Sequence, residues 1–408
     1  MIPAALQAQP IDPKVQARID RILKATPLID GHNDLPEQLA ENYKRSVAGL
    51  ASGSDKRNPN PLMTDMARLR QGRVGAQFWS VFIDASLHGD EAIRETLQEI
   101  DVVDRLVQAY PNDLELAYTA DDVVRIHRAG KVASLIGIEG GHQIGGSLAA
   151  LRQFYRLGAR YMTLAHFANS EVADSATDDP KYHGLSPFGR TVVGEMNRLG
   201  MLIDLAHVSE DTMRGAIEIS RAPVIFSHSS ARAIDDHPRN VPDGVLALLP
   251  KNGGVVMVNF YSGYVSDAVR KWNAEETAEE ARLKSLLVGR PQQRDEALAA
   301  WKKANPEPTA TVGEIADHIE HIVKIAGYDH VGIGGDLDGI PYDEAPAGMN
   351  SVSGYPLVFA ELIRRGWSDE NLAKLAGGNV LRAMRQAEAV AASMKEVQPA
   401  LSDVDTGK

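Results

Sequence analysis

Residues 27–36 read PLIDGHNDLP, and this stretch contains the pattern from which the fold can be predicted. A short apolar run, PLID, is followed almost directly by His32 and Asp34. Side chains two residues apart in an extended chain point to the same side, so an imidazole and a carboxylate leave this strand end together. The same arrangement, an apolar run that ends in a reactive side chain, recurs along the chain.

Seven further apolar runs, each bounded by turn residues, follow the first one. With residues 27–30, the predicted strands are residues 76–83, 132–139, 159–166, 200–207, 223–230, 253–260 and 330–338. Amphipathic helical patterns such as GRTVVGEMNRLG lie between most of them. Nearly continuous apolar strands that alternate with helices are typical of a parallel sheet covered by helices. Eight such units predict a closed (β/α)8 barrel of the TIM type, with an open doubly wound sheet as the alternative.

Side chains capable of acid–base or metal chemistry lie at the carboxyl ends of these predicted strands. They are His32 and Asp34 after the first, Glu139 on the third, His166 on the fourth, His207 on the fifth, His228 on the sixth and Asp336 on the eighth. In barrel enzymes the carboxyl ends of the strands form the mouth that carries the active site. We therefore predict that these residues, far apart in sequence, lie together at one mouth.

Two insertions interrupt the regular alternation of strands and helices. Residues 40–65 form a long polar excursion after the first strand, and residues 266–310 form a charged, helical insertion after the seventh. Both follow strands, so we expect them to form walls or lids of the same mouth. We predict one barrel domain over residues 1–385 and a polar tail over residues 386–408.

Composition limits the chemistry and the partners of the chain. Its 408 residues include no cysteine and have a formal net charge of -12. Disulfides, thiolate ligands and a cysteine nucleophile are therefore excluded, and any metal must be held by His, Asp or Glu, which suits zinc or manganese. The negative charge argues against a nucleic-acid partner. No apolar run approaches the roughly 20 residues needed to span a bilayer.

The two ends of the chain bear on localisation. The start, MIPAALQAQP, lacks the basic and apolar regions of an intact signal peptide, although its small residues fit the remnant of a trimmed one. The polar end contains no signal for a lipid anchor. We expect a soluble protein of bacterial type without a membrane anchor, cytoplasmic or, if the start is a trimmed remnant, periplasmic.

Taken singly, the predicted mouth residues have ordinary interpretations, such as a hydrogen-bonded His-x-Asp pair or a partly buried imidazole. Together, three histidines and two carboxylates at four strand ends predict a metal centre, formed by His32, Asp34, Glu139, His207 and His228. A single catalytic zinc usually takes three protein ligands and a water, so five ligands suit two metals that share one carboxylate. Glu139 stands between the two pairs and is the expected bridge.

Two glycine-rich motifs need separate interpretation. In GIGGDLDG the other positions of a calcium loop are absent, which excludes that interpretation. We expect Asp336, rather than Asp338, to face the mouth. There it would accept a proton from metal-activated water and pass it to a leaving amine. EGGHQIGG lacks the spacing of a phosphate-binding loop. Its glycines fit a sharp bend beside the metal site, and we expect His142 to be structural.

Several longer motifs point to a family. They are LIDGHNDLP, IEGG, YMTLAH, GLSPFGRTVVGEMNRLGMLIDLAHVS, VIFSHSSAR, RNVPDGVL, VMVNFY and HVGIGGDLDG. In these motifs, which extend over nearly the whole chain, the sequence resembles the membrane (renal) dipeptidase family of binuclear zinc peptidases, within the amidohydrolase-like barrels. The resemblance implies a dipeptidase that hydrolyses free dipeptides through a hydroxide bridging two Zn²⁺, and a homodimer. It leaves open whether a D-residue is accepted at the C-terminal side.

The resemblance also implies roles for individual residues. His32, Asp34 and Glu139 would hold one zinc ion. Glu139, His207 and His228 would hold the other.

The same resemblance implies substrate contacts at three positions. His166 would contact the substrate and polarise the scissile carbonyl or stabilise its oxyanion. Arg239, in PRNVPD, would bind the C-terminal carboxylate, a task that suits the bidentate geometry of a guanidinium. Asp336 would be the proton-shuttling acid.

The chain departs from the family pattern in three respects. It lacks the cysteines and the lipid anchor of the mammalian members, so it resembles the soluble bacterial branch. Glu37 follows HNDLP where some relatives have an aromatic residue, so the edge of the substrate pocket can differ. The charged insertion after the seventh strand leaves substrate preference open.

Two other function classes are compatible with a barrel. A lactonase, phosphotriesterase, cyclic amidase or deaminase of the same superfamily would commonly carry a His-x-His pair on the first strand and a modified lysine as the bridge, whereas this chain has His-x-Asp and no lysine at the end of the fourth strand. A non-catalytic scaffold would have lost some ligands, and none of the expected ones is missing.

Overall fold

Strand β1 (Leu28–Asn33), which carries His32, is buried along its whole length in a computed structural model that describes residues 10–401. It pairs in parallel with β2 (Val74–Phe82) on one side and with β9 (Val331–Ile333) on the other. From β9 the order continues through β8 (Val255–Val258), β7 (Val224–Phe226), β6 (Leu202–Asp204), β5 (Ala159–Thr163) and β4 (Val132–Glu139). Strand β4 pairs with β2, which closes the ring. The predicted (β/α)8 barrel is confirmed.

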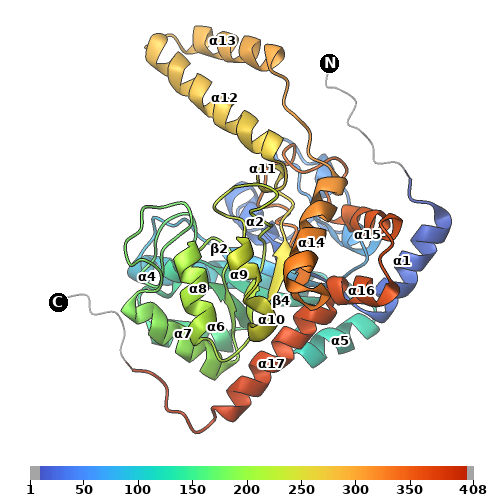
Figure 1. Ribbon diagram of the computed structural model, residues 1–408, viewed down its shortest axis with the longest axis vertical. Helices are drawn as coiled ribbons and strands as arrows, with labels where there is room; N and C mark the ends of the chain where they lie inside the picture. Colours follow the sequence, from blue (N-terminus) through green and yellow to red (C-terminus); the bar gives the residue numbers. More distant parts are fainter. Residues whose placement is uncertain (1–9, 402–408) are drawn as a thin grey trace.

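Helices surround this barrel on the outside (Figure 1). They are α1 (Pro13–Ala25), α2 (Leu35–Tyr43), α3 (Met66–Gln71), α4 (Gly89–Ala109), α5 (Ala120–Arg128), α6 (Leu148–Arg156), α7 (Pro187–Leu199), α8 (Glu210–Ile219), α9 (Asp243–Leu246), α10 (Leu249–Asn252), α11 (Ser262–Val265), α12 (Asp267–Leu286), α13 (Pro291–Ala304), α14 (Val312–Ala326), α15 (Tyr355–Arg364), α16 (Asp369–Ala373) and α17 (Asn379–Ser393). Short turns are η1 (Ser54–Lys56), η2 (Gly141–Ile144), η3 (Tyr328–His330), η4 (Val352–Gly354) and the π-type η5 (Lys374–Gly378). None of the helices within residues 10–401 is both long and apolar enough to cross a bilayer.

Side chains alternate along the strands between the interior of the barrel and the helical layer. Phe78 and Leu135 belong to an inner apolar cluster, whereas their neighbours Trp79 and Ile136 belong to the larger cluster under the helices. The inner cluster also contains residues of α5 and α17, so these two helices close the amino-terminal end of the barrel. The opposite end, where the strands finish, is therefore the end left for a site.

The strands are shorter than the apolar runs from which they were predicted. Strands β5, β6 and β7 end at Thr163, Asp204 and Phe226, so His166, His207 and His228 lie beyond the strand ends. The intervening residues are apolar because they are buried under the loops, as Leu164 and Leu205 are. Because the apolar run continues past the last residue of each strand, hydrophobicity does not mark where the strand ends. One further strand, β3 (Leu114–Leu116), was not predicted; it pairs with the start of β4 outside the ring.

The predicted boundary between residues 385 and 386 lies inside α17, which continues to Ser393. The apolar residues Val380, Ala383 and Ala387 recur at helical spacing across that boundary and are all buried against the barrel. The tail therefore begins after α17. Residues 402–408 of the predicted tail, and residues 1–9 with the predicted signal remnant, lie outside the described part.

The insertion after β8 forms a projecting helical hairpin of α12 and α13 (Figure 1). Its two helices are joined through Trp272, whose ring centroid is 5.9 Å from that of Trp301 and whose Nε1 donates a hydrogen bond to the Asn305 carbonyl. No residue of α13 is buried. The hairpin follows directly on α11, whose Tyr264 lines the cavity at the barrel mouth, whereas no residue of the insertion, 266–310, lines that cavity.

A buried carboxyl group in α4 gives a testable pH dependence of stability. Glu99 is 3 % exposed, and one of its oxygens lies 3.4 Å from Arg45 Nε while the other has no hydrogen-bond partner. Burial raises the pKa of Glu99 to about 7 from the ordinary value of 4.5. The folded protein therefore binds the Glu99 proton more tightly than the unfolded chain does. This contribution to the free energy of unfolding is fully present below pH 4.5 and is lost as the pH rises through 7.

The Glu99→Gln variant has no proton to lose at this position. We expect it to match the wild type at pH 5 and to be more stable at pH 8, by about 1–3 kcal/mol, in urea denaturation. The exposed Glu91→Gln in the first turn of the same helix is the control; any loss of its helix-dipole stabilisation should be of similar size at both pH values. A Glu99→Gln effect of equal size at both pH values would contradict the prediction.

Candidate metal centre

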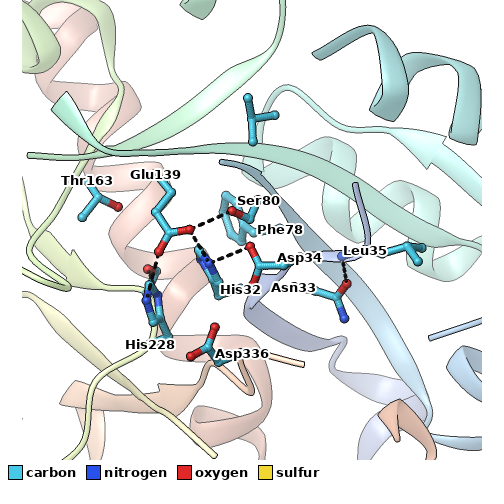
Figure 2. Close-up of polar contacts among 12 residues, drawn as sticks. His32, Asn33, Asp34, Leu35, Phe78, Ser80, Glu139, Thr163, His228 and Asp336 are labelled. Atoms are coloured by element: carbon cyan, nitrogen blue, oxygen red, sulfur yellow. Dashed lines mark hydrogen bonds and ion pairs between the residues drawn. The ribbon is translucent and has the colours of Figure 1, made fainter. Parts of the chain in front are cut away.

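The five predicted metal ligands come from four strand ends and meet around the Glu139 carboxylate. Its Oε2 lies 3.2 Å from His32 Nε2. Its Oε1 lies 3.0 Å from His207 Nε2 and 3.3 Å from His228 Nε2. Asp34 Oδ1 is 3.3 Å from the same nitrogen of His32. Figure 2 shows Glu139 between His32 and His228, with Asp34 and Asp336 beside them.

The donor atoms of this cluster fit a cation better than they fit one another. The Nε2 atoms of His207 and His228 are only 2.8 Å apart, and burial lowers the pKa of both imidazoles well below the usual range. Both oxygens of the buried Asp34 carboxylate lack a hydrogen-bond partner. Buried carboxylates are normally paired or bound to a metal. Two neutral imidazoles and a buried carboxylate whose oxygens accept no hydrogen bond are donors of the kind that bind divalent zinc.

The cluster contains three overlapping groups of donors, and within each group the ligand atoms lie within 4.8 Å of one another. They are His32, Glu139 and His228; Glu139, His166 and His207; and His32, Asp34 and Asp336. Glu139 belongs to the first two of these groups and His32 to the first and third. The arrangement could therefore hold more than one metal ion, with Glu139 shared.

The ring of His32 is oriented by a buried tyrosine from β5. The Tyr161 hydroxyl donates to the Gly31 carbonyl at 3.2 Å and lies 2.8 Å from His32 Nδ1. The Nδ1–H of His32 therefore donates to Tyr161, which leaves the Nε2 lone pair facing Glu139. Gly137 on β4 makes room for the Tyr161 ring, because a Cβ at this position would lie 2.0 Å from the Cζ atom of Tyr161.

A second polar chain orients His228. Its Nδ1 is 2.8 Å from Ser227 Oγ, and that hydroxyl donates to Asp204 Oδ2 at 2.6 Å. Ser227 therefore accepts the Nδ1–H of His228 and leaves Nε2 free for a ligand. Thr163 donates to the same Asp204 oxygen at 2.7 Å. On the Glu139 side, Ser80 Oγ donates to Oε2 at 3.1 Å.

Two site residues have left-handed backbone conformations. His207 has φ 66° and Asp336 has φ 59°, a region that side chains other than glycine seldom occupy. Asn259 donates to Asp336 Oδ2 at 2.8 Å, and burial raises the pKa of Asp336 to about 8. Asp338, by contrast, accepts from the Met63 amide at 2.7 Å. Asp336 lines the cavity described next, and Asp338 does not.

The ligand cluster opens into a cavity of about 260 Å³. Its charged and imidazole lining consists of Asp34, Glu37, Glu139, His166, His207, Arg239 and Asp336. Aromatic walls come from Phe82, Phe167, Tyr261 and Tyr264, the last two at the base of the α12–α13 hairpin. This is the volume of a small ligand, and it places a metal-type donor set in contact with charged groups of both signs.

Arg239 is a buried guanidinium that faces this cavity. It is 1 % exposed, and its Nη1 and Nη2 donate to Ser229 Oγ at 3.4 Å and to the His228 carbonyl at 3.2 Å. Its Nε has no partner, and within residues 10–401 no carboxylate forms an ion pair with it. The Tyr264 ring lies 5.3 Å from the guanidinium carbon. Such a group can bind an anionic part of a ligand.

His166 also lines the cavity, and Arg239 acts electrostatically on it. Its Nε2 is 3.6 Å from Glu139 Oε1, and its ring packs 4.2 Å from that of His207 and 4.2 Å from that of Phe167. Burial lowers the pKa of His166 to about 4, so the imidazole is neutral. A neutral imidazole at this position can donate one hydrogen bond into the cavity.

Sequence reasoning missed the residues that orient the ligands: Tyr161, Ser227, Asp204, Ser80 and Asn259. A weak signal existed, since each is a polar residue in or beside a nearly continuous apolar run. Their partners come from other strands and could not be identified from spacing. His142 lies outside the donor groups and has its Nε2 3.3 Å from the Ile83 carbonyl.

Comparisons with known proteins point to one family. The family model described as "Membrane dipeptidase (Peptidase family M19)" matches residues 16–398. Dipeptidase tcpJ of Claviceps purpurea is 42% identical over 388 residues, which cover 92% of this chain and 80% of that protein. Dipeptidase verJ of Clonostachys rogersoniana is 39% identical over 387 residues, which cover 92% and 88%.

Solved structures agree with these sequence matches. The probable dipeptidase PvdM from Pseudomonas aeruginosa has a TM-score of 0.77 at 27% identity and covers 93% of this chain and 100% of its own. A metallo peptidase from Rhodobacter sphaeroides, liganded with a phosphinate mimic of the dipeptide L-Ala-D-Ala, shares the fold with a TM-score of 0.73 at 22% identity, covering 89% and 99%. The chain therefore belongs to the membrane dipeptidase family, peptidase family M19, whose members named here are dipeptidases, and it is a metal-dependent dipeptidase.

Proposed function

We propose that the chain hydrolyses free dipeptides with two zinc ions that share Glu139. His32, Asp34 and Glu139 hold one ion, and Glu139, His207 and His228 hold the other. The observation that carries this proposal is the position of the Glu139 carboxylate, whose two oxygens face different donor groups, Oε2 toward His32 and Oε1 toward His207 and His228. Bound zinc would supply Lewis-acid activation of water and of the scissile carbonyl.

Arg239 fixes the substrate at its C-terminal end. Its buried guanidinium, with an unpartnered Nε, pairs with the free carboxylate of a dipeptide. A longer peptide would have an amide where this carboxylate belongs and would lose the ion pair with Arg239. The requirement for a free carboxylate one residue beyond the scissile bond selects dipeptides.

Three residues then act on the reacting groups. His166, a neutral imidazole, donates a hydrogen bond to the carbonyl oxygen as negative charge develops on it. Asp336, held by Asn259, accepts a proton from the attacking water and passes it to the leaving amine. Glu139 contacts both donor groups and fixes their positions relative to each other. We therefore assign it a catalytic role in addition to its role as a ligand. The raised pKa of Asp336, about 8, suits a group that takes up and returns a proton.

The proposal extends to substrate stereochemistry and assembly. Dipeptides with a D-residue at the C-terminal side are included among the substrates, and comparing L-Ala-D-Ala with L-Ala-L-Ala tests this. A homodimer, which the family resemblance implies, is also proposed. Light scattering would then give twice the mass of the 44.2 kDa chain.

Metal content tests the ligand assignment. We expect about two zinc ions per wild-type chain by elemental analysis, about one in His32→Ala or His207→Ala, and none held tightly in Glu139→Ala, because only Glu139 serves both ions. His142→Ala removes a buried imidazole outside the donor groups and should leave the zinc content unchanged. One zinc per wild-type chain, or a Glu139→Ala variant that retains one tightly bound zinc, would contradict the assignment.

Substrate carboxylate binding is tested with a pair of changes. Amidation of the C-terminus should lower kcat/KM of the wild type by roughly 100-fold, because it leaves the buried Arg239 charge without its partner. Arg239→Gln should lose a similar factor on free dipeptides and should no longer distinguish them from the amides. Arg221→Gln, an exposed arginine before β7, is the matched control. Arg239→Gln kinetics that still favour the free carboxylate would exclude this role.

A further inference from the structure

The cavity has charges of opposite sign at its two ends. Arg239 acts electrostatically on His166 and His207, whose pKa values it lowers after the larger effect of burial. Glu37 instead interacts with Asp34 and Asp336, at the β1 and β9 side of the mouth. In the barrel, β8 and β9 separate β1 from β7, after which Arg239 lies. The positive and negative groups are thus on different sides of the ligand cluster.

Glu37 has no cation to pair with. It lies in the first turn of α2, lines the cavity, and among residues 10–401 forms no ion pair. Burial, followed by the carboxylates of Asp34 and Glu41, raises the pKa of Glu37 to about 10. A positive group that enters the cavity beside Glu37 favours its ionised form and pairs with it.

The position of Arg239 decides which part of a dipeptide can reach Glu37. With the C-terminal carboxylate at Arg239 and the scissile carbonyl at the ligand cluster, the first residue must lie on the side of Asp34 and Asp336. Its α-ammonium is two bonds from the scissile carbon and so stays close to the cluster. Glu37 is three residues beyond Asp34 along α2, about 4.5 Å further along the helix axis, within reach of a side chain.

Resting on the proposed function, we propose that Glu37 binds a cationic side chain on the first residue of the dipeptide, so that the enzyme prefers Lys-X, Arg-X or ornithyl-X substrates. The side chain's ammonium or guanidinium pairs with the Glu37 carboxylate while Arg239 holds the opposite end. The two charges then fix both the register and the direction of the substrate. An acid in the first turn of a helix also stabilises that helix, and the test must separate the two roles.

The first comparison uses the zinc-loaded wild type alone. Lys-Ala should be hydrolysed with kcat/KM roughly 10-fold or more above that of Nε-acetyl-Lys-Ala and norleucyl-Ala, which lack the positive charge, because hydrogen bonds to charged groups are worth at least a factor of this size. Ala-Lys should show no such advantage over Ala-norleucine. Equal rates for Lys-Ala and its acetylated form would overturn the inference without any variant.

The second comparison uses Glu37→Gln. It should bring the ratio of kcat/KM for Lys-Ala over norleucyl-Ala to about one while the protein keeps its zinc, whereas a purely structural role would lower both rates by the same factor. Glu41→Gln, which removes an exposed carboxylate one turn further along α2 and outside the cavity, should retain the preference. Equal losses on Lys-Ala and norleucyl-Ala would assign Glu37 to the α-ammonium instead and overturn the inference. No turnover of any dipeptide by the wild type would overturn the proposed function itself, whereas turnover of all without preference overturns only this inference.

Discussion

The interaction on which the site depends is the convergence of buried imidazoles on the two oxygens of Glu139. Three histidine Nε2 atoms, those of His32, His207 and His228, lie within 3.3 Å of this carboxylate. Burial opposes charge on Glu139, yet His32 and His166 hold its pKa well below the usual range. Without a cation, the Nε2 atoms of His207 and His228 crowd each other at 2.8 Å, and neither oxygen of Asp34 accepts a hydrogen bond. A divalent metal removes both penalties, so the fold and the metal chemistry are coupled.

The barrel makes this convergence possible because its strand ends lie on one rim. Each ligand is also held from behind, His32 by Tyr161 and His228 through Ser227 and Asp204. These contacts set which ring nitrogen carries the proton and therefore which one faces the cavity. The left-handed conformation of His207 also positions a ligand. It turns the chain in the loop after β6, so that the imidazole lies over the mouth.

Much of this could be predicted from apolar periodicity and from the reactive residue at the end of each run. The closed barrel and the convergence of His32, Asp34, Glu139, His207 and His228 follow from those two patterns. The ends of β5 to β7 could not be predicted, because loop residues such as Leu164 and Leu205 are as buried as the strands. Tyr161 and Asp204 were missed because their roles depend on contacts between strands distant in sequence. The predicted boundary after residue 385 lies within α17, whose apolar spacing continues to Ala387.

Anomalous diffraction at the zinc absorption edge, from crystals of the wild-type protein grown with zinc, would locate the metal ions relative to Glu139. If Glu139 serves two ions, we expect two zinc peaks, one next to Glu139 Oε2 with His32 and Asp34, and one next to Oε1 with His207 and His228. Two such metals sharing a carboxylate are about 3.5–4 Å apart in known binuclear sites. A single peak, or two peaks of which one does not contact Glu139, would contradict the account.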